Sequence, residues 1–164
     1  MSSTALQALS ETVLSACREA RLKLATAESC TGGLVAAALT DIAGSSDVVE
    51  RGFVTYSNEA KSELLGIPAA MIAAHGAVSA QVATAMVQGA LSRAPVDLAV
   101  SVTGIAGPGG ATPGKPVGLV YFGIARKGGT ARVERHTFHG DRAAVRWAAT
   151  ERALELLLEA VRGR

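Results

Sequence analysis

The stretch TAESCTGG, residues 26–33, places a serine and a cysteine side by side in front of two glycines. Either side chain is a candidate nucleophile, because a hydroxyl or thiol that loses its proton can attack a carbonyl carbon. Gly32 and Gly33 carry no side chain that would block a substrate, and the free amides of a helix beginning near Thr31 would stabilise an oxyanion. The alternative is that Ser29 and Thr31 only cap a helix, and their spacing alone favours that alternative.

A serine nucleophile needs a base, which in most enzymes is a histidine. The surroundings of the three histidines give no such signal: His75, His136 and His139. Lys61 follows the end of a second predicted strand in YSNEAK, so Tyr56 and Lys61 would approach Ser29 if the two strands are neighbours. A lysine accepts a proton only when burial or nearby positive charge lowers its pKa from about 10.4. The alternative, a solvated helix lysine between Glu59 and Glu63, is the one that the sequence alone favours.

Two other kinds of site are disfavoured. Cys17 and Cys30 form no CxxC pair and the histidines lack HxxxH spacing, so we expect no metal and no cofactor. The stretch GGATPGKP, residues 109–116, fits the phosphate-binding pattern G-x-x-x-x-G-K. Pro116 stands where a magnesium-binding Ser or Thr is required, and a strand rather than a helix follows. We therefore reject a nucleoside-triphosphatase site.

Alternating and helical apolar patterns predict the elements that must position these residues. The predicted strands span 23–29, 50–57, 97–104, 117–125 and 131–139, and the last two form a hairpin. The predicted helices span 4–20, 32–44, 58–67, 79–93 and 141–162, with a short helical piece between the third and the fourth. The helix-end signals are Gly44 as a stop and Asn58, Ser79 and Asp141 as N-terminal caps. This order predicts an α/β fold, a mixed sheet between helical layers.

Composition limits the function classes. The chain has 164 residues, of which 49% are hydrophobic and only 4% aromatic, so one domain over residues 1–164 with a core of small aliphatic residues is expected. A net charge of +2 without a basic cluster argues against a nucleic-acid partner. The first twenty residues lack the basic and apolar blocks of a signal peptide, and no apolar run would span a bilayer. We expect a cytoplasmic protein with reduced thiols and no membrane contact.

Six stretches in a fixed order carry a resemblance to a known family: TAESCTGG, ERGFVTYSNEAKSELLGI, HGAVS, SVTGIAGPGG, GKPVGLVYFGIA and GDRAAVR. The chain resembles the CinA C-terminal domain family from about residue 5 to 160. The resemblance implies a three-layer α/β/α sandwich with a mixed, mostly parallel sheet, a C-terminal hairpin and a last helix. It also implies a serine–lysine dyad, Ser29 and Lys61, that deamidates nicotinamide mononucleotide. Some members carry a further N-terminal domain resembling molybdopterin-binding proteins, which we expect this chain to lack.

The expected catalytic residues are Ser29, Lys61 and, as a hydrogen-bonding partner of the two, Tyr56, whose alternative role is core packing. The expected oxyanion and substrate-binding residues are Glu28, Cys30, Thr31, Gly32, Gly33, Thr103, Gly104, Gly107 and Arg142, with Arg146 as a second candidate for the substrate phosphate. Glu28 has an alternative role, because an acid beside a helix N-terminus stabilises that helix. The expected partner is a small molecule, and we expect a homo-oligomer, by default a dimer. The alternative function is a non-catalytic nucleotide-binding or competence-associated module.

Overall fold

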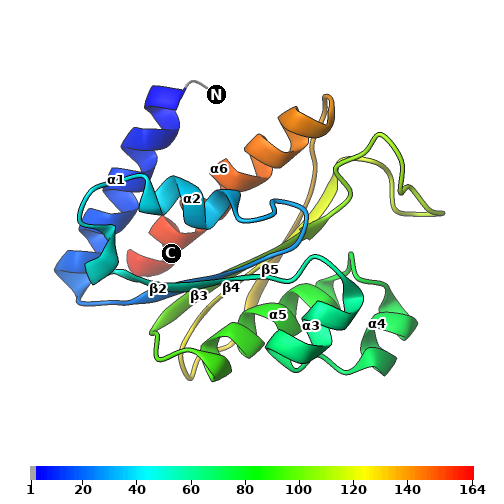
Figure 1. Ribbon diagram of the computed structural model, residues 1–164, viewed down its shortest axis with the longest axis horizontal. Coiled ribbons are helices and arrows are strands. Elements are labelled where there is room, and N and C mark those ends of the chain that lie inside the picture. Colours follow the sequence, from blue (N-terminus) through cyan, green and yellow to red (C-terminus); the bar gives the residue numbers. More distant parts are fainter. Residues whose placement is uncertain (1–2) are drawn as a thin grey trace.

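The computed structural model describes residues 3–164, and its centre is a five-stranded sheet with the strand order β2-β1-β3-β4-β5 (Figure 1). The strands are β1 (Leu24–Glu28), β2 (Val49–Val54), β3 (Leu98–Gly104), β4 (Leu119–Arg126) and β5 (Arg132–Thr137). β1 pairs in parallel with β2 and with β3, whereas β4 is antiparallel to both β3 and β5. All strands except β4 therefore run in one direction, which confirms the predicted mixed, mostly parallel sheet.

Helices cover both faces of this sheet, which confirms the three-layer architecture (Figure 1). One layer holds α1 (Ser3–Ala20), α2 (Leu34–Thr40) and α6 (Arg142–Val161), and the other holds α3 (Asn58–Leu65), α4 (Ala69–His75) and α5 (Ala80–Arg93). A short 3₁₀ turn, η1 (Ser45–Asp47), precedes β2. None of the helices within residues 3–164 is long and apolar enough to cross a membrane.

The two faces of the sheet are packed with side chains of different size. Larger apolar residues fill the space under α1 and α6, among them Leu14, Leu24, Leu98, Phe122 and Leu154. On the α5 side, the three central strands contribute alanines instead: Ala27, Ala99 and Ala125. These small side chains let α5 lie close to the sheet.

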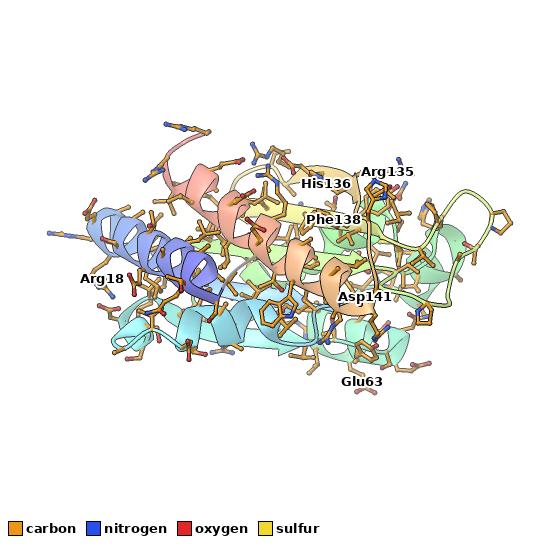
Figure 2. The ribbon with its side chains drawn as sticks, turned by 90° about the horizontal axis from the view of Figure 1, so that it is seen from above. Arg18, Glu63, Arg135, His136, Phe138 and Asp141 are labelled. Atoms are coloured by element: carbon orange, nitrogen blue, oxygen red, sulfur yellow. The ribbon has the colours of Figure 1, made fainter. Side chains whose placement is uncertain are left out.

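The helix boundaries follow the predicted signals with two exceptions. Ser79 caps α5 by accepting a hydrogen bond from the Val82 amide (3.2 Å), and Asp141 caps α6 at the Ala144 amide (2.9 Å), as predicted. Figure 2 shows Asp141 at the start of α6, in the layer that contains α1 and α2. The N-cap of α3 is Ser57 rather than Asn58, because the Ser57 hydroxyl accepts from the Ala60 amide (3.0 Å).

The second exception is α2, which is shorter than the predicted helix over residues 32–44. It starts only at Leu34, because Gly33 has the left-handed φ of 101° and cannot form part of a right-handed helix. It ends at Thr40, and Gly44, the predicted stop, instead precedes η1 with a φ of 83°. The residues between β1 and α2 therefore form a turn, Ser29–Gly33, which we call the nucleophile turn.

Candidate active site

The nucleophile turn begins where β1 leaves the sheet. The Ser29 amide donates to the Val102 carbonyl (2.9 Å), which continues the pairing of β1 with β3 by one residue. Ser29 thus lies at the carboxyl edge of the parallel strands, where open α/β sheets bind ligands. Its side chain is 8% exposed. The predicted strand–turn–helix arrangement is present.

Lys61 lies against this serine. Its Nζ is 3.0 Å from Ser29 Oγ, 2.8 Å from the Thr55 carbonyl oxygen and 3.3 Å from the Tyr56 carbonyl oxygen. The residue is only 1% exposed, so the solvated-lysine alternative is wrong. Burial lowers the pKa of Lys61 from 10.5, because removing water penalises the ammonium form. The structure therefore brings together a serine hydroxyl and a lysine that loses its proton more easily than a solvated lysine does.

Two elements set this contact. β1 and β2 are parallel neighbours with Glu28 opposite Val54, so the residues that follow the two strands lie side by side. Lys61 then enters from α3, whose first turn Ser57 caps and whose end Gly66 terminates in a left-handed conformation.

A cavity of about 220 Å³ opens beside the serine and the lysine. Its lining comes from the nucleophile turn, from the start of α3 and from the residues around the end of β3: Ser29, Cys30, Tyr56, Asn58, Lys61, Ala77, Val78, Thr103, Gly104, Ala106 and Arg142. Six of the residues predicted from the sequence to form the site thus share one cavity with Lys61. Thr103 lies there with its hydroxyl donating to the Ala77 carbonyl (2.8 Å).

The sequence analysis missed four lining residues. Asn58 belongs to the quoted YSNEAK stretch, but its position suggested only a helix cap. Ala77, Val78 and Ala106 are small apolar residues in connecting segments, and such residues carry no chemical signal in a sequence. Only the burial and backbone path of these segments reveal that they face the serine.

Glu28 has a different place from the one expected for a substrate-binding residue. The residue is fully buried, and its carboxylate accepts from the Thr31 hydroxyl (2.7 Å), the Val35 amide (2.9 Å) and the Ala36 amide (3.1 Å). It lies outside the cavity lining. These contacts correspond to the helix-stabilising alternative, in which a carboxylate satisfies the free amides of the first turn of α2.

Tyr56 and Arg142 meet at the cavity mouth. Tyr56 is 61% exposed, so it is not a core residue, and its hydroxyl accepts from Arg142 Nη2 (3.0 Å). Arg142 Nη1 donates to the Gly107 carbonyl (2.8 Å). Tyr56 therefore contacts Lys61 through its backbone carbonyl and not through its phenol, and Gly107 contributes a carbonyl that holds Arg142.

Arg146, the second arginine considered for the substrate phosphate, does not line the cavity. Its Nε donates to the Cys30 carbonyl (3.1 Å) and its Nη2 to the Thr31 carbonyl (3.2 Å). Thr31, Gly32 and Gly33 likewise lie outside the lining and build the turn behind Ser29. Of the two arginines, only Arg142 is placed to meet a ligand in the cavity.

Cys30 lines the cavity, but its thiol is 6% exposed, and burial raises its pKa to about 12. Burial thus outweighs the lowering that a helix N-terminus gives to a thiol. Within residues 3–164, no group of three or more His, Cys, Asp or Glu side chains is arranged to hold a metal ion.

Comparisons with known proteins agree with this architecture. The nicotinamide-nucleotide amidohydrolase PncC of Escherichia coli (strain K12) is 51% identical over 157 residues, which is 96% of this chain and 95% of that protein. The crystal structure of competence/damage inducible protein CihA from Agrobacterium tumefaciens matches with a TM-score of 0.92 and 44% identity, over 96% of this chain and 95% of that chain.

Other relatives are longer proteins. The CinA-like protein of Citrifermentans bemidjiense is 57% identical over 140 residues, which is 85% of this chain but 34% of that protein. The chain spans about a third of the length of several such curated relatives. The family model described as the CinA C-terminal domain matches residues 6–161. The match extends over nearly the whole chain, and the chain therefore belongs to the CinA C-terminal domain family.

Proposed function

We propose that this chain hydrolyses the carboxamide of nicotinamide mononucleotide, giving nicotinate mononucleotide and ammonia. The observation that carries the proposal is the 3.0 Å contact between Lys61 Nζ and Ser29 Oγ, both in buried side chains at a cavity. The name of the Escherichia coli relative, nicotinamide-nucleotide amidohydrolase, supports the choice of substrate.

The hydrogen bonds around Lys61 suit a general base. A neutral amine has two N–H groups and one lone pair, and Nζ has two carbonyl acceptors, on Thr55 and Tyr56. When these carbonyls take the two N–H groups, the lone pair is left for the proton of the Ser29 hydroxyl. Desolvation lowers the Lys61 pKa and so makes this neutral form more accessible than it is in a solvated lysine.

The reaction then proceeds through an acyl-enzyme. Lys61 takes the Ser29 proton while Ser29 Oγ forms a bond to the carboxamide carbon, and the negative charge moves to the amide oxygen. The protonated Lys61 passes its proton to the amide nitrogen as the C–N bond breaks and ammonia leaves. Water attacks the ester carbon and gives a proton to Lys61, and the proton returns to Ser29 Oγ when the carboxylic acid is released.

The cavity charge suits an anionic substrate. Among its lining residues two are basic, Lys61 and Arg142, and none is acidic. Arg142 is exposed at the mouth, where a guanidinium binds a phosphate through two parallel hydrogen bonds. The phosphate of the nucleotide would therefore face Arg142 while the carboxamide reaches Ser29.

Ammonia release from nicotinamide mononucleotide tests the proposal, with nicotinamide as the control substrate. Ser29→Ala is expected to lower kcat by about 10³-fold or more, because no other side chain replaces the nucleophile. Lys61→Arg is expected to be as inactive as Lys61→Ala, since a guanidinium stays protonated and cannot accept the serine proton. Lys127→Ala, on the exposed hairpin turn, serves as the matched control and retains full activity.

Two outcomes would contradict the proposal. A wild-type chain that releases no ammonia from the nucleotide would leave the non-catalytic module as the better interpretation. Substantial activity in Lys61→Arg would remove Lys61 from the chemistry and leave Ser29 without a base.

A further inference from the structure

Arg146 holds the nucleophile turn from the side of α6. It is half-buried, and both of its hydrogen bonds go to backbone carbonyls of this turn, those of Cys30 and Thr31. A hydrogen bond from a charged donor is about twice as strong as a neutral one, so two of them fix the orientation of two peptide groups. The Cβ position of Gly32 lies 3.3 Å from Arg146 Nη2, which leaves little space for a side chain there.

Glu28 holds the same turn from within. Its carboxylate accepts from the Thr31 hydroxyl and from the first amides of α2, so Thr31 is fixed through its side chain as well as through its carbonyl. A cation and an anion thus restrain the turn from two sides, and neither lines the cavity.

This restraint has a consequence for the turn amides. In a trans peptide the carbonyl and the following N–H point in opposite directions. With the Cys30 carbonyl held by Arg146, the Thr31 N–H points away from α6. The Ser29 amide is used by the Val102 carbonyl and the Gly32 amide by the Ser29 carbonyl, whereas within residues 3–164 the amides of Cys30, Thr31 and Gly33 donate to no other residue.

We propose that Arg146 is a positioning residue, whose guanidinium orients the nucleophile turn and its unpaired amides relative to the oxyanion formed at Ser29. The inference rests on the proposed function, because it assigns a role within that hydrolysis. It replaces the earlier expectation that Arg146 binds the substrate phosphate. Arg146 acts on the transition state through the backbone, and it touches neither the substrate nor Ser29.

The test separates kcat from KM. Loss of one oxyanion donor lowers kcat by roughly 10²–10³-fold, and a donor that is only misaligned is expected to cost less, so Arg146→Gln should lower kcat about 10–100-fold. KM should change by less than about threefold, since ground-state binding is untouched. Arg146→Lys should recover only part of the loss, because an ammonium cannot donate to two carbonyls in a fixed fork. Arg162→Gln, at the exposed end of the same helix, is the control with unchanged kinetics.

Chemical rescue gives a readout that a purely structural role would not move. Millimolar guanidinium is expected to raise kcat of Arg146→Ala and to leave the wild type and Arg162→Gln unchanged. Melting temperatures identify variants that are unfolded in the assay. If Arg146→Gln or Arg146→Ala is unfolded, the kinetics of Arg146→Lys, which keeps the charge and most of the aliphatic side chain, are used in its place.

The outcomes distinguish the two proposals. If the wild type releases no ammonia from the nucleotide, the proposed function fails and the inference fails with it. If the wild type is active and Arg146→Gln raises KM with kcat unchanged, or is fully active, the inference alone is overturned. A fall in kcat at constant KM, with rescue by guanidinium, supports it.

Discussion

Lys61 differs from a surface lysine in a measurable property, its pKa. Burial lowers this pKa from 10.5, and only the neutral amine accepts the serine proton. We therefore expect kcat/KM for nicotinamide mononucleotide to rise with pH along a limb whose midpoint lies below 10.5. A pH–rate profile of the free enzyme checks this. A limb centred at 10.5 or above would show that Lys61 keeps the pKa of a solvated lysine.

The same shift makes the stability of the fold depend on pH. Between the lowered folded pKa and 10.5, the unfolded chain binds a proton at Lys61 that the folded chain does not bind. The free energy of unfolding therefore rises with pH through this window, and this contribution is lost as the pH falls towards the folded pKa. The free energies of unfolding of the wild type and of Lys61→Met can be compared by urea unfolding at several pH values. Their difference should shift in favour of the wild type as the pH rises. A constant difference would contradict the shift.

Cys30 is the neighbouring nucleophile, and its environment argues against that role. Burial raises its pKa to about 12, so at neutral pH the thiol carries its proton and reacts slowly. Cys30→Ala is expected to keep kcat within about tenfold of the wild type, because it loses a buried sulfur but no reacting atom. Steady-state kinetics of this variant beside Ser29→Ala provide the comparison. An inactive Cys30→Ala with an active Ser29→Ala would reverse the two assignments.

At the scale of elements, the distance between α3 and α5 determines where Lys61 lies. Gly89 of α5 permits this approach, because a Cβ at this position would lie 2.4 Å from the Leu65 carbonyl oxygen at the end of α3. Gly89→Ala must push α3 away, at a cost of about 1–3 kcal/mol that exceeds the gain of roughly 1 kcal/mol in helix propensity. We expect lower stability in urea unfolding together with reduced kcat, since Lys61 moves with α3.

Gly109→Ala is the matched control for this substitution. A Cβ at Gly109 meets no atom within 4 Å, so stability and kcat should stay at the wild-type values. A Gly89→Ala chain with unchanged stability would mean that α3 tolerates the added methyl group. In that case the spacing of these two helices does not control the site.

For the molecule as a whole, periodicity and capping residues were sufficient to predict every strand and a mixed sheet between helical layers. They were not sufficient for the contact between Ser29 and Lys61, which depends on β1 and β2 being neighbours. Strand order is a tertiary property, and the pattern along the chain does not determine which strands are neighbours. The burial of Lys61 was likewise hidden, because its sequence neighbours Glu59 and Glu63 are those of a solvated helix face.

The contributions of Glu28 and Arg146 were beyond the sequence for another reason. Each bonds to backbone groups in or next to the nucleophile turn. Every residue type has these backbone groups, so the sequence does not reveal which of them is bonded. Arg142 and Arg146 are four residues apart on one helix and look equivalent in the sequence. The direction in which α6 crosses the sheet separates them, bringing Arg142 to the cavity and Arg146 to the turn.

The hydrogen bond from Arg146 to the Cys30 carbonyl joins residues 116 positions apart. While a ribosome is still adding the C-terminal helix, the emerging chain already contains both Ser29 and Lys61 but not this support. On our proposal, a nascent chain that still lacks this helix cannot hydrolyse the nucleotide efficiently. Recovery of activity after dilution from denaturant would then require the docking of α6 as well as the pairing of the strands.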